Sequence, residues 1–100
     1  MNLVILPQAL AELQHATAFY IEHANLALGE SFAAEFERAI STLLEHPLIG
    51  NVWRGSTRRF PLRRFPHSIV YQIKPDLLRV VGCSSEPPPR LLPAAGNKRW

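Results

Sequence analysis

The feature that most constrains the fold of this chain is a change of sequence pattern at Pro47. Before Pro47, apolar residues recur at the three- and four-residue spacing of amphipathic helices. After it, β-branched and aromatic residues gather in short runs. Helices followed by consecutive strands are typical of an α+β fold, in which helices pack on one face of a sheet. The chain has 100 residues, 47% of them apolar, which suits one domain around one core.

The region before Pro47 predicts two helices. The first begins at Pro7, since proline is favoured in the first helical turn, where its missing N–H costs nothing. Residues 25–29 interrupt the helical spacing, and a second helix then runs to His46, because the residue before a proline avoids the helical conformation. We expect an antiparallel helical hairpin. Its predicted core residues are Leu10, Leu13, Phe32, Phe36 and Ile40.

The remaining pattern predicts strands. Residues 3–6 (LVIL) form a short buried strand, and residues 47–56 read as a loop because they contain two glycines and a proline. The runs TRRFPLRRF, SIVYQI and LLRVVGC follow, with a turn at residues 74–76 between the last two. The predicted order is β-α-α-β-β-β, a two-helix hairpin packed on a small antiparallel sheet, with Ile69 and Tyr71 in the core.

Domain boundaries follow from proline content. Residues 1–85 are predicted to form the domain, and residues 86–100 (EPPPRLLPAAGNKRW) a disordered tail, because their prolines exclude a regular helix or an inner strand.

Composition excludes several classes of protein. A single cysteine, Cys83, cannot form an intramolecular disulfide, and no apolar run is long enough to cross a membrane. The N-terminus has no positively charged segment of the kind that begins a signal peptide, so we expect a cytoplasmic protein.

His15 and His23 are eight residues apart, too far for a helical metal pair, and there is no glycine-rich phosphate loop. We therefore predict neither a metal nor a cofactor.

Charge is distributed unevenly along the chain. Residues 1–50 carry one arginine against six glutamates, a balance of −5, whereas residues 51–100 carry ten basic against two acidic side chains, a balance of +8. This asymmetry indicates a basic face that meets an anionic partner, although two solvated faces of opposite sign would show the same pattern.

Five arginines with interleaved aromatic residues form the candidate contact site for a target or a nucleic acid. They are Arg54, Arg58, Arg59, Arg63 and Arg64. Guanidinium groups bind phosphate through paired donors and stack on bases. If residues 57–60 are extended, Arg58 and Arg59 point to opposite faces of the sheet. The alternative is an edge strand that carries charge to avoid pairing with another molecule. No catalytic set is identified, and Tyr71, which alternates with Ile69 and Ile73, is favoured as a core aromatic over a catalytic one.

Two segments, in this order of elements, resemble the RelE/ParE superfamily of type II toxins, also called plasmid stabilisation proteins. The first is Glu45-His46-Pro47-Leu48-Ile49-Gly50, similar to the short "hP..G" stop after that family's second helix. The second is Arg63-Arg64-Phe65-Pro66-His67-Ser68-Ile69-Val70-Tyr71, which resembles its "l..fPy.ivY" strand. The resemblance covers residues 1–81 and is closer to the ParE branch.

The resemblance implies a partner and a target. It implies a cognate antitoxin that binds the toxin and keeps it silent. It also implies either poisoning of DNA gyrase, as in ParE, or cleavage of mRNA on the ribosome, as in RelE. A module that binds proteins without toxicity is the third reading.

The C-terminus departs from the family pattern. In members of the family, the last strand is usually followed by a histidine, an arginine and a tyrosine–tryptophan pair, whereas here Val81 is followed by GCSSEPPPRLLPAAGNKRW. The family's histidine, arginine and tyrosine cannot be assigned to positions in this sequence. Degenerate codons permit a family-like ending when the gene is read one nucleotide later after Val81, so a frameshifted and weakened or inactive toxin is a hypothesis.

Overall fold

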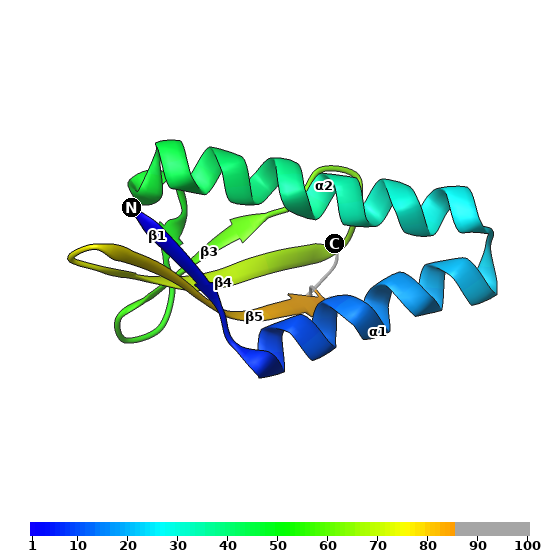
Figure 1. Ribbon diagram of the computed structural model, residues 1–100, viewed down its shortest axis with the longest axis horizontal. Helices are drawn as coiled ribbons and strands as arrows, with labels where there is room; N and C mark the ends of the chain where they lie inside the picture. Colours follow the sequence, from blue (N-terminus) through cyan, green and yellow to red (C-terminus); the bar gives the residue numbers. More distant parts are fainter. Residues whose placement is uncertain (86–100) are drawn as a thin grey trace, which may run out of the picture.

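The computed structural model describes residues 1–85, and the predicted tail, residues 86–100, lies outside them. The elements are β1 (Asn2–Ile5), α1 (Pro7–His23), α2 (Leu26–Glu45), the short 3-10 helix η1 (Pro47–Ile49), β2 (Asn51–Val52), β3 (Thr57–Pro61), β4 (His67–Lys74) and β5 (Leu77–Ser85). The predicted α+β class and the β-α-α-β-β-β order are confirmed, with one strand more (Figure 1). That strand, β2, lies in the segment predicted to be a loop and was missed because two residues carry no alternation.

The five strands lie in the order β1-β5-β4-β3-β2. The strands from β2 to β5 are antiparallel to their neighbours, as predicted, but β1 pairs with β5 in parallel, so the sheet is mixed. The sequence predicted that the N-terminal strand joins the meander, but it did not indicate the direction of β1, because its partner β5 lies more than 70 residues away in the chain. A register shift in the β4–β5 ladder lies between Val70 and Tyr71.

The core lies between the helical hairpin and one face of the sheet. Phe32, Phe36 and Ile40 of α2 are buried, as predicted, together with Ile69 and Tyr71 of β4. Leu43, Leu78 and Val80 complete its interior. An aromatic group of Tyr20, Phe32, Phe65 and His67 closes one end, with ring centroids 4.9–5.9 Å apart.

The buried stripe of α1 differs from the predicted one. Ala9 is fully buried and Leu13 is half-buried, but Leu10 is 43% exposed, so the prediction for Leu10 was wrong. The helix packs along the line of Ala9, Leu13 and Ala16. The small alanines lie against the sheet and turn the larger Leu10 outward, an orientation that apolar spacing alone does not distinguish.

The predicted break at residues 25–29 lies mostly inside α2. Asn25 caps the helix by accepting a hydrogen bond from the Leu28 backbone N–H at 2.8 Å, and the helix begins at Leu26. Gly29 is therefore helical. A Cβ at this position would overlap the Ile21 side chain, so glycine permits the two helices to approach closely.

The run TRRFPLRRF also forms less strand than predicted. β3 ends at Pro61, and residues 62–66 form a turn in which Arg64 has a φ of 66°. The Leu62 N–H donates to the His67 carbonyl at 2.9 Å across this turn. Proline at position 61 and again at 66 limits ladder hydrogen bonding, which ends the strand.

Candidate functional site

The side chain of Tyr71 holds the turn that follows α2. Its buried hydroxyl donates to the Pro47 carbonyl at 2.6 Å and accepts from the Gly50 backbone N–H at 3.0 Å. A Cβ at residue 50 would lie 2.5 Å from this hydroxyl, so the close approach requires glycine. Burial raises the pKa of Tyr71, which keeps the hydroxyl protonated. The interpretation of Tyr71 as a core aromatic is confirmed.

Arg58 fixes the same turn from the neighbouring strand. Its guanidinium donates to the Gly50 carbonyl at 2.8 Å and to the Leu48 carbonyl at 3.3 Å. Arg58 is opposite Tyr71 in the β3–β4 register and shares its face of the sheet, whereas Arg59 is opposite Val70 and points to the other face. The prediction that Arg58 and Arg59 point to opposite faces is confirmed. Arg58 is a structural residue in this arrangement.

A tryptophan and two arginines lie close together after this turn. The Arg54 guanidinium carbon lies 4.6 Å from the centroid of the Trp53 ring, and that of Arg59 lies 5.8 Å from it. A hollow of about 280 Å³ beside them is lined by Asn51, Val52, Trp53, Arg59 and Pro61. We call the group formed by the exposed Val52, Trp53 and Arg54 and the half-buried Arg59 the Trp53 surface.

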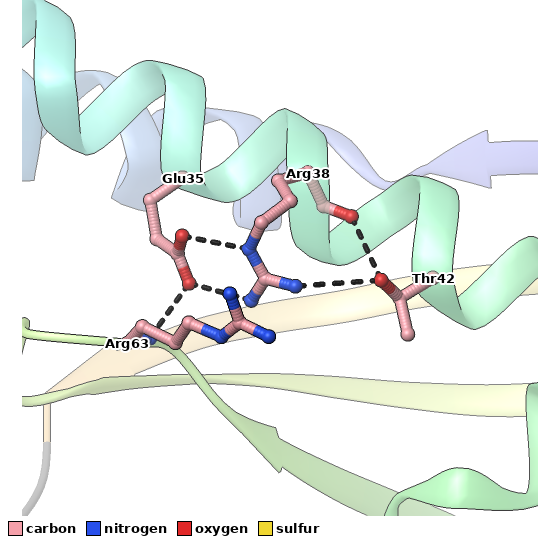
Figure 2. Close-up of polar contacts among 4 residues, drawn as sticks. All are labelled: Glu35, Arg38, Thr42 and Arg63. Atoms are coloured by element: carbon pink, nitrogen blue, oxygen red, sulfur yellow. Dashed lines mark hydrogen bonds and ion pairs between the residues drawn. The ribbon is translucent and has the colours of Figure 1, made fainter.

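The other two predicted arginines lie at the opposite end of β3. The Arg63 backbone N–H donates to Glu35 Oε2 at 2.6 Å, and the same carboxylate holds Arg38 through hydrogen bonds of 2.7 and 2.8 Å (Figure 2). Arg64 is exposed in the adjacent turn. The five predicted arginines therefore form two groups at the two ends of β3, with Arg58 turned inward, and not one continuous site.

Glu35 connects α2 with the β3–β4 turn. Hydrogen bonds from Arg38, together with the Arg63 N–H, lower the pKa of Glu35, although partial burial opposes the shift. Arg38 also donates to Thr42 Oγ1 at 3.4 Å (Figure 2). This network positions the turn that carries the second family-like segment.

Sequence reasoning did not identify a groove along α1. Two hollows of about 360 and 310 Å³ share Ala16 and His67. The first is also lined by Glu12, His15, Cys83 and Ser84, and the second by Phe19, Tyr20 and Pro66. These residues come from three separate parts of the chain, so no local spacing could have indicated the groove.

Two hydrogen bonds occupy polar groups of this groove. Tyr20 Oη and His67 Nε2 lie 3.1 Å apart, and Glu12 accepts from the Cys83 backbone N–H at 2.8 Å. Burial raises the pKa of the Cys83 thiol to about 11, so the thiol stays protonated near neutral pH and is a poor nucleophile. Within residues 1–85, no three histidine, cysteine or acidic side chains lie together as metal ligands would.

Comparison with known proteins identifies the family. The model of the ParE toxin of the type II toxin–antitoxin system, parDE, matches residues 3–83. The chain belongs to the ParE toxin family. The fold also matches a solved structure described as a chromosomal ParDE toxin–antitoxin system from P. aeruginosa. The TM-score is 0.77 and the sequence identity 16%, and the match covers 86% of this chain and 96% of the other. No curated protein matches the sequence significantly.

The segments that carry the resemblance lie inside the matched region. The match spans both segments that carry the resemblance, and the structure brings these segments into direct contact through Tyr71, Pro47 and Gly50. Neither helix within residues 1–85 combines the length and the apolar character that crossing a bilayer requires.

Proposed function

We propose that this chain is the toxin of a type II toxin–antitoxin module, that a cognate antitoxin neutralises it, and that it acts on DNA gyrase in the cytoplasm. The observation that carries the proposal is the ParE family match over residues 3–83. The exposed Trp53 surface, which joins apolar and arginine side chains, supports contact with a protein target.

Exposed apolar side chains support binding of an antitoxin. Phe19, Ile21 and Leu26 are exposed near the connection of the two helices, and Leu3 and Val4 are exposed on β1, which forms one edge of the sheet. Antitoxin segments of the helical or extended type can cover such surfaces, by helix packing or by strand addition. The exposed side of the hairpin and the sheet edges are therefore the proposed contacts for the antitoxin.

The alternative of a RelE-like mRNA endonuclease is less favoured. Such a nuclease needs basic and tyrosine side chains that converge on the scissile phosphate. The sequence has two tyrosines, and both hydroxyls take part in hydrogen bonds within the protein, Tyr71 with Pro47 and Gly50 and Tyr20 with His67. The predicted arginines are divided between two ends and two faces of the sheet.

The test compares two reactions in the presence of increasing concentrations of the purified chain. The proposal predicts that DNA supercoiling by gyrase falls while a translated mRNA stays intact. Cleavage of the mRNA with unchanged supercoiling would establish the RelE-like alternative. If neither reaction changes with this chain or with a version whose reading frame is restored after Val81, the third reading, a protein-binding module without toxicity, is favoured.

A further inference from the structure

The part of β5 that follows Val80 has different neighbours on its two sides. β4 pairs with β5 as far as Ser85, whereas β1 pairs only with Leu77–Val80. Beyond Val80, no strand among residues 1–85 lies on the β1 side, and α1 runs beside this end of β5 (Figure 1). The groove between α1 and the ends of β4 and β5 lies here.

We call this groove, formed by the two hollows that share Ala16 and His67, the α1 groove. The hollow of about 310 Å³ is lined by Phe19, Tyr20 and Pro66, and Phe19 is 53% exposed. An apolar side chain of a partner would remove this ring from water, which favours binding. Both hollows lie at the lower end of the roughly 300–1,000 Å³ of small-molecule sites, so they fit single side chains better than a cofactor.

The other hollow contains the half-buried carboxylate of Glu12, which forms no ion pair within residues 1–85. One of its oxygens accepts a hydrogen bond from the Cys83 backbone N–H at 2.8 Å. That donor is neutral, and a carboxylate has two oxygens with about four acceptor sites, so Glu12 keeps its charge and can accept a further donor. Neither hollow is lined by lysine or arginine, and α1 carries two glutamates and neither of those cations.

The two hollows together suit a segment with two different side chains. Glu12 and Phe19 are seven residues apart on α1, a rise of about 10 Å, which roughly three residues of an extended chain span. An apolar residue and a lysine or arginine at about this separation would fill the apolar hollow and place a charged donor on Glu12. Such a charge-assisted hydrogen bond is stronger than one between neutral groups.

We propose that the α1 groove is the docking site for a short basic segment of the antitoxin, which places an apolar side chain beside Phe19 and a lysine or arginine on Glu12. This assignment rests on the proposed function, since that function supplies the antitoxin. Charge complementarity favours this occupant over a nucleic acid, whose phosphates the Glu12 carboxylate repels. A nucleic acid and a second copy of this chain are the competing occupants.

The experiment selects binding peptides from a displayed library of random short peptides, with the purified full-length chain as bait. The selected peptides should be enriched in an apolar residue with a lysine or arginine about three positions away. Phe19→Ala should weaken their binding at least about tenfold, because it removes one wall of the apolar hollow. Leu10→Ala is the matched control, since Leu10 is exposed on α1 and lines neither hollow, and it should change binding by less than about twofold.

A second pair of variants tests the charge. Glu12→Gln keeps an oxygen that can accept from the Cys83 N–H but removes the charge, and it should weaken binding of the same peptides at least about threefold. Glu37→Gln makes the same change at an exposed position of α2 and should leave binding unchanged within about 1.5-fold. Fluorescence polarisation gives the affinities, and urea unfolding of each variant shows that it is folded.

Selected peptides without a basic residue, or peptides whose binding survives either Phe19→Ala or Glu12→Gln, would overturn the proposal. So would a thymidine oligonucleotide that displaces the peptides, or self-association of the chain that Phe19→Ala abolishes. The small protein encoded beside the gene should displace the peptides. If it binds the chain without displacing them, the docking site is wrong although the antitoxin exists. If it does not bind at all, the proposed function fails, and the docking assignment with it.

Discussion

The hydroxyl of Tyr71 lies 3.0 Å from the backbone nitrogen of Gly50, 21 residues earlier in the chain. This hydrogen bond, with that from the same hydroxyl to Pro47, joins the turn after α2 to the centre of β4. Both segments by which the sequence resembles ParE toxins therefore belong to one structural unit. In the structure, this unit holds Gly50, the residue directly before β2, which leads to Trp53.

Removing the Tyr71 hydroxyl should destabilise the domain. Tyr71→Phe leaves the buried Gly50 N–H and the Pro47 carbonyl without this partner, so we expect the free energy of unfolding to fall by about 1–3 kcal/mol. Tyr20→Phe is the matched control, since it removes one longer and half-buried hydrogen bond, and it should cost about 0.5–1 kcal/mol. Urea unfolding measures both, and equal losses would contradict a special role for Tyr71.

The carboxylate of Glu35 should also contribute to stability. Glu35→Gln removes the charge that holds Arg38 and the Arg63 N–H, and we expect a loss of about 1–2 kcal/mol near neutral pH. Glu37→Gln, an exposed position on the same helix, is the control and should change stability by less than about 0.5 kcal/mol.

The contribution of Glu35 should depend on pH. Because the pKa of Glu35 is lowered in the folded state, its stabilisation is present above the ordinary value of 4.5 and is lost as pH falls through the lowered pKa. The difference in unfolding free energy between the wild type and Glu35→Gln should therefore shrink in acid. A difference that stays constant to about pH 2 would show that the carboxylate charge is not responsible.

His67 should make the domain sensitive to mild acid. Its Nδ1 is buried with no hydrogen-bond partner among residues 1–85, and burial lowers the pKa of the ring below the ordinary value of 6.5. Protons therefore bind the unfolded chain more readily, and unfolding free energy should fall as pH decreases from about 7 to about 5. The neighbouring Tyr20 and Cys83 do not titrate there, since burial raises the pKa of each.

The check for His67 is a comparison of two variants. His67→Phe should flatten the pH dependence of stability in this range, whereas His15→Gln, on the exposed side of α1, should leave it unchanged. A histidine proton resonance of His67 that titrates at or above pH 6.5 in NMR spectra would contradict the account.

The order of the elements could be predicted because it depends on local patterns. Helical spacing up to His46 and alternation in SIVYQI each report which face of one element is buried, and Phe32, Phe36, Ile69 and Tyr71 are in the core as expected. The errors concern relations between elements. Leu10 lies outside the core because α1 packs through Ala9 on the neighbouring line of the helix, and the parallel pairing of β1 with β5 joins two segments that no local pattern relates.

The candidate site could be predicted only in part. The sequence shows that five arginines lie close together in the chain, but it does not show that they separate into two groups in the fold. That separation depends on the strand register, which places Arg58 on the inner face, and on the turn at residues 62–66, which brings the Arg63 N–H to Glu35. The groove between α1 and the ends of β4 and β5 left no local signal, since its residues meet only in the folded chain.

We propose that the altered C-terminus weakens the toxin. The β5 strand is paired with β4 as far as Ser85, but the half-buried Gly82 and the exposed Ser84 supply little apolar area where the resemblance implies apolar side chains. A restored frame that buries two or three apolar side chains from position 82 onward would add roughly 1–3 kcal/mol of stability at about 25 cal/mol per Å² of apolar surface. The chain as written should therefore show little or no toxicity on induction in a host without an antitoxin, and a version with the reading frame restored after Val81 should arrest growth. Equal arrest by both would show that the tail is not essential.

The most direct measurement of the central claim is the binding of this chain to the protein encoded by the reading frame beside its gene. The account predicts a small antitoxin there, which forms a complex that survives gel filtration and has a dissociation constant in the nanomolar range, about −12 kcal/mol by titration calorimetry. Phe19→Glu, a charge placed on the exposed apolar side of the hairpin, should weaken the complex, whereas Arg64→Glu should not. A folded chain that shows neither a complex nor binding heat with that protein would contradict the account.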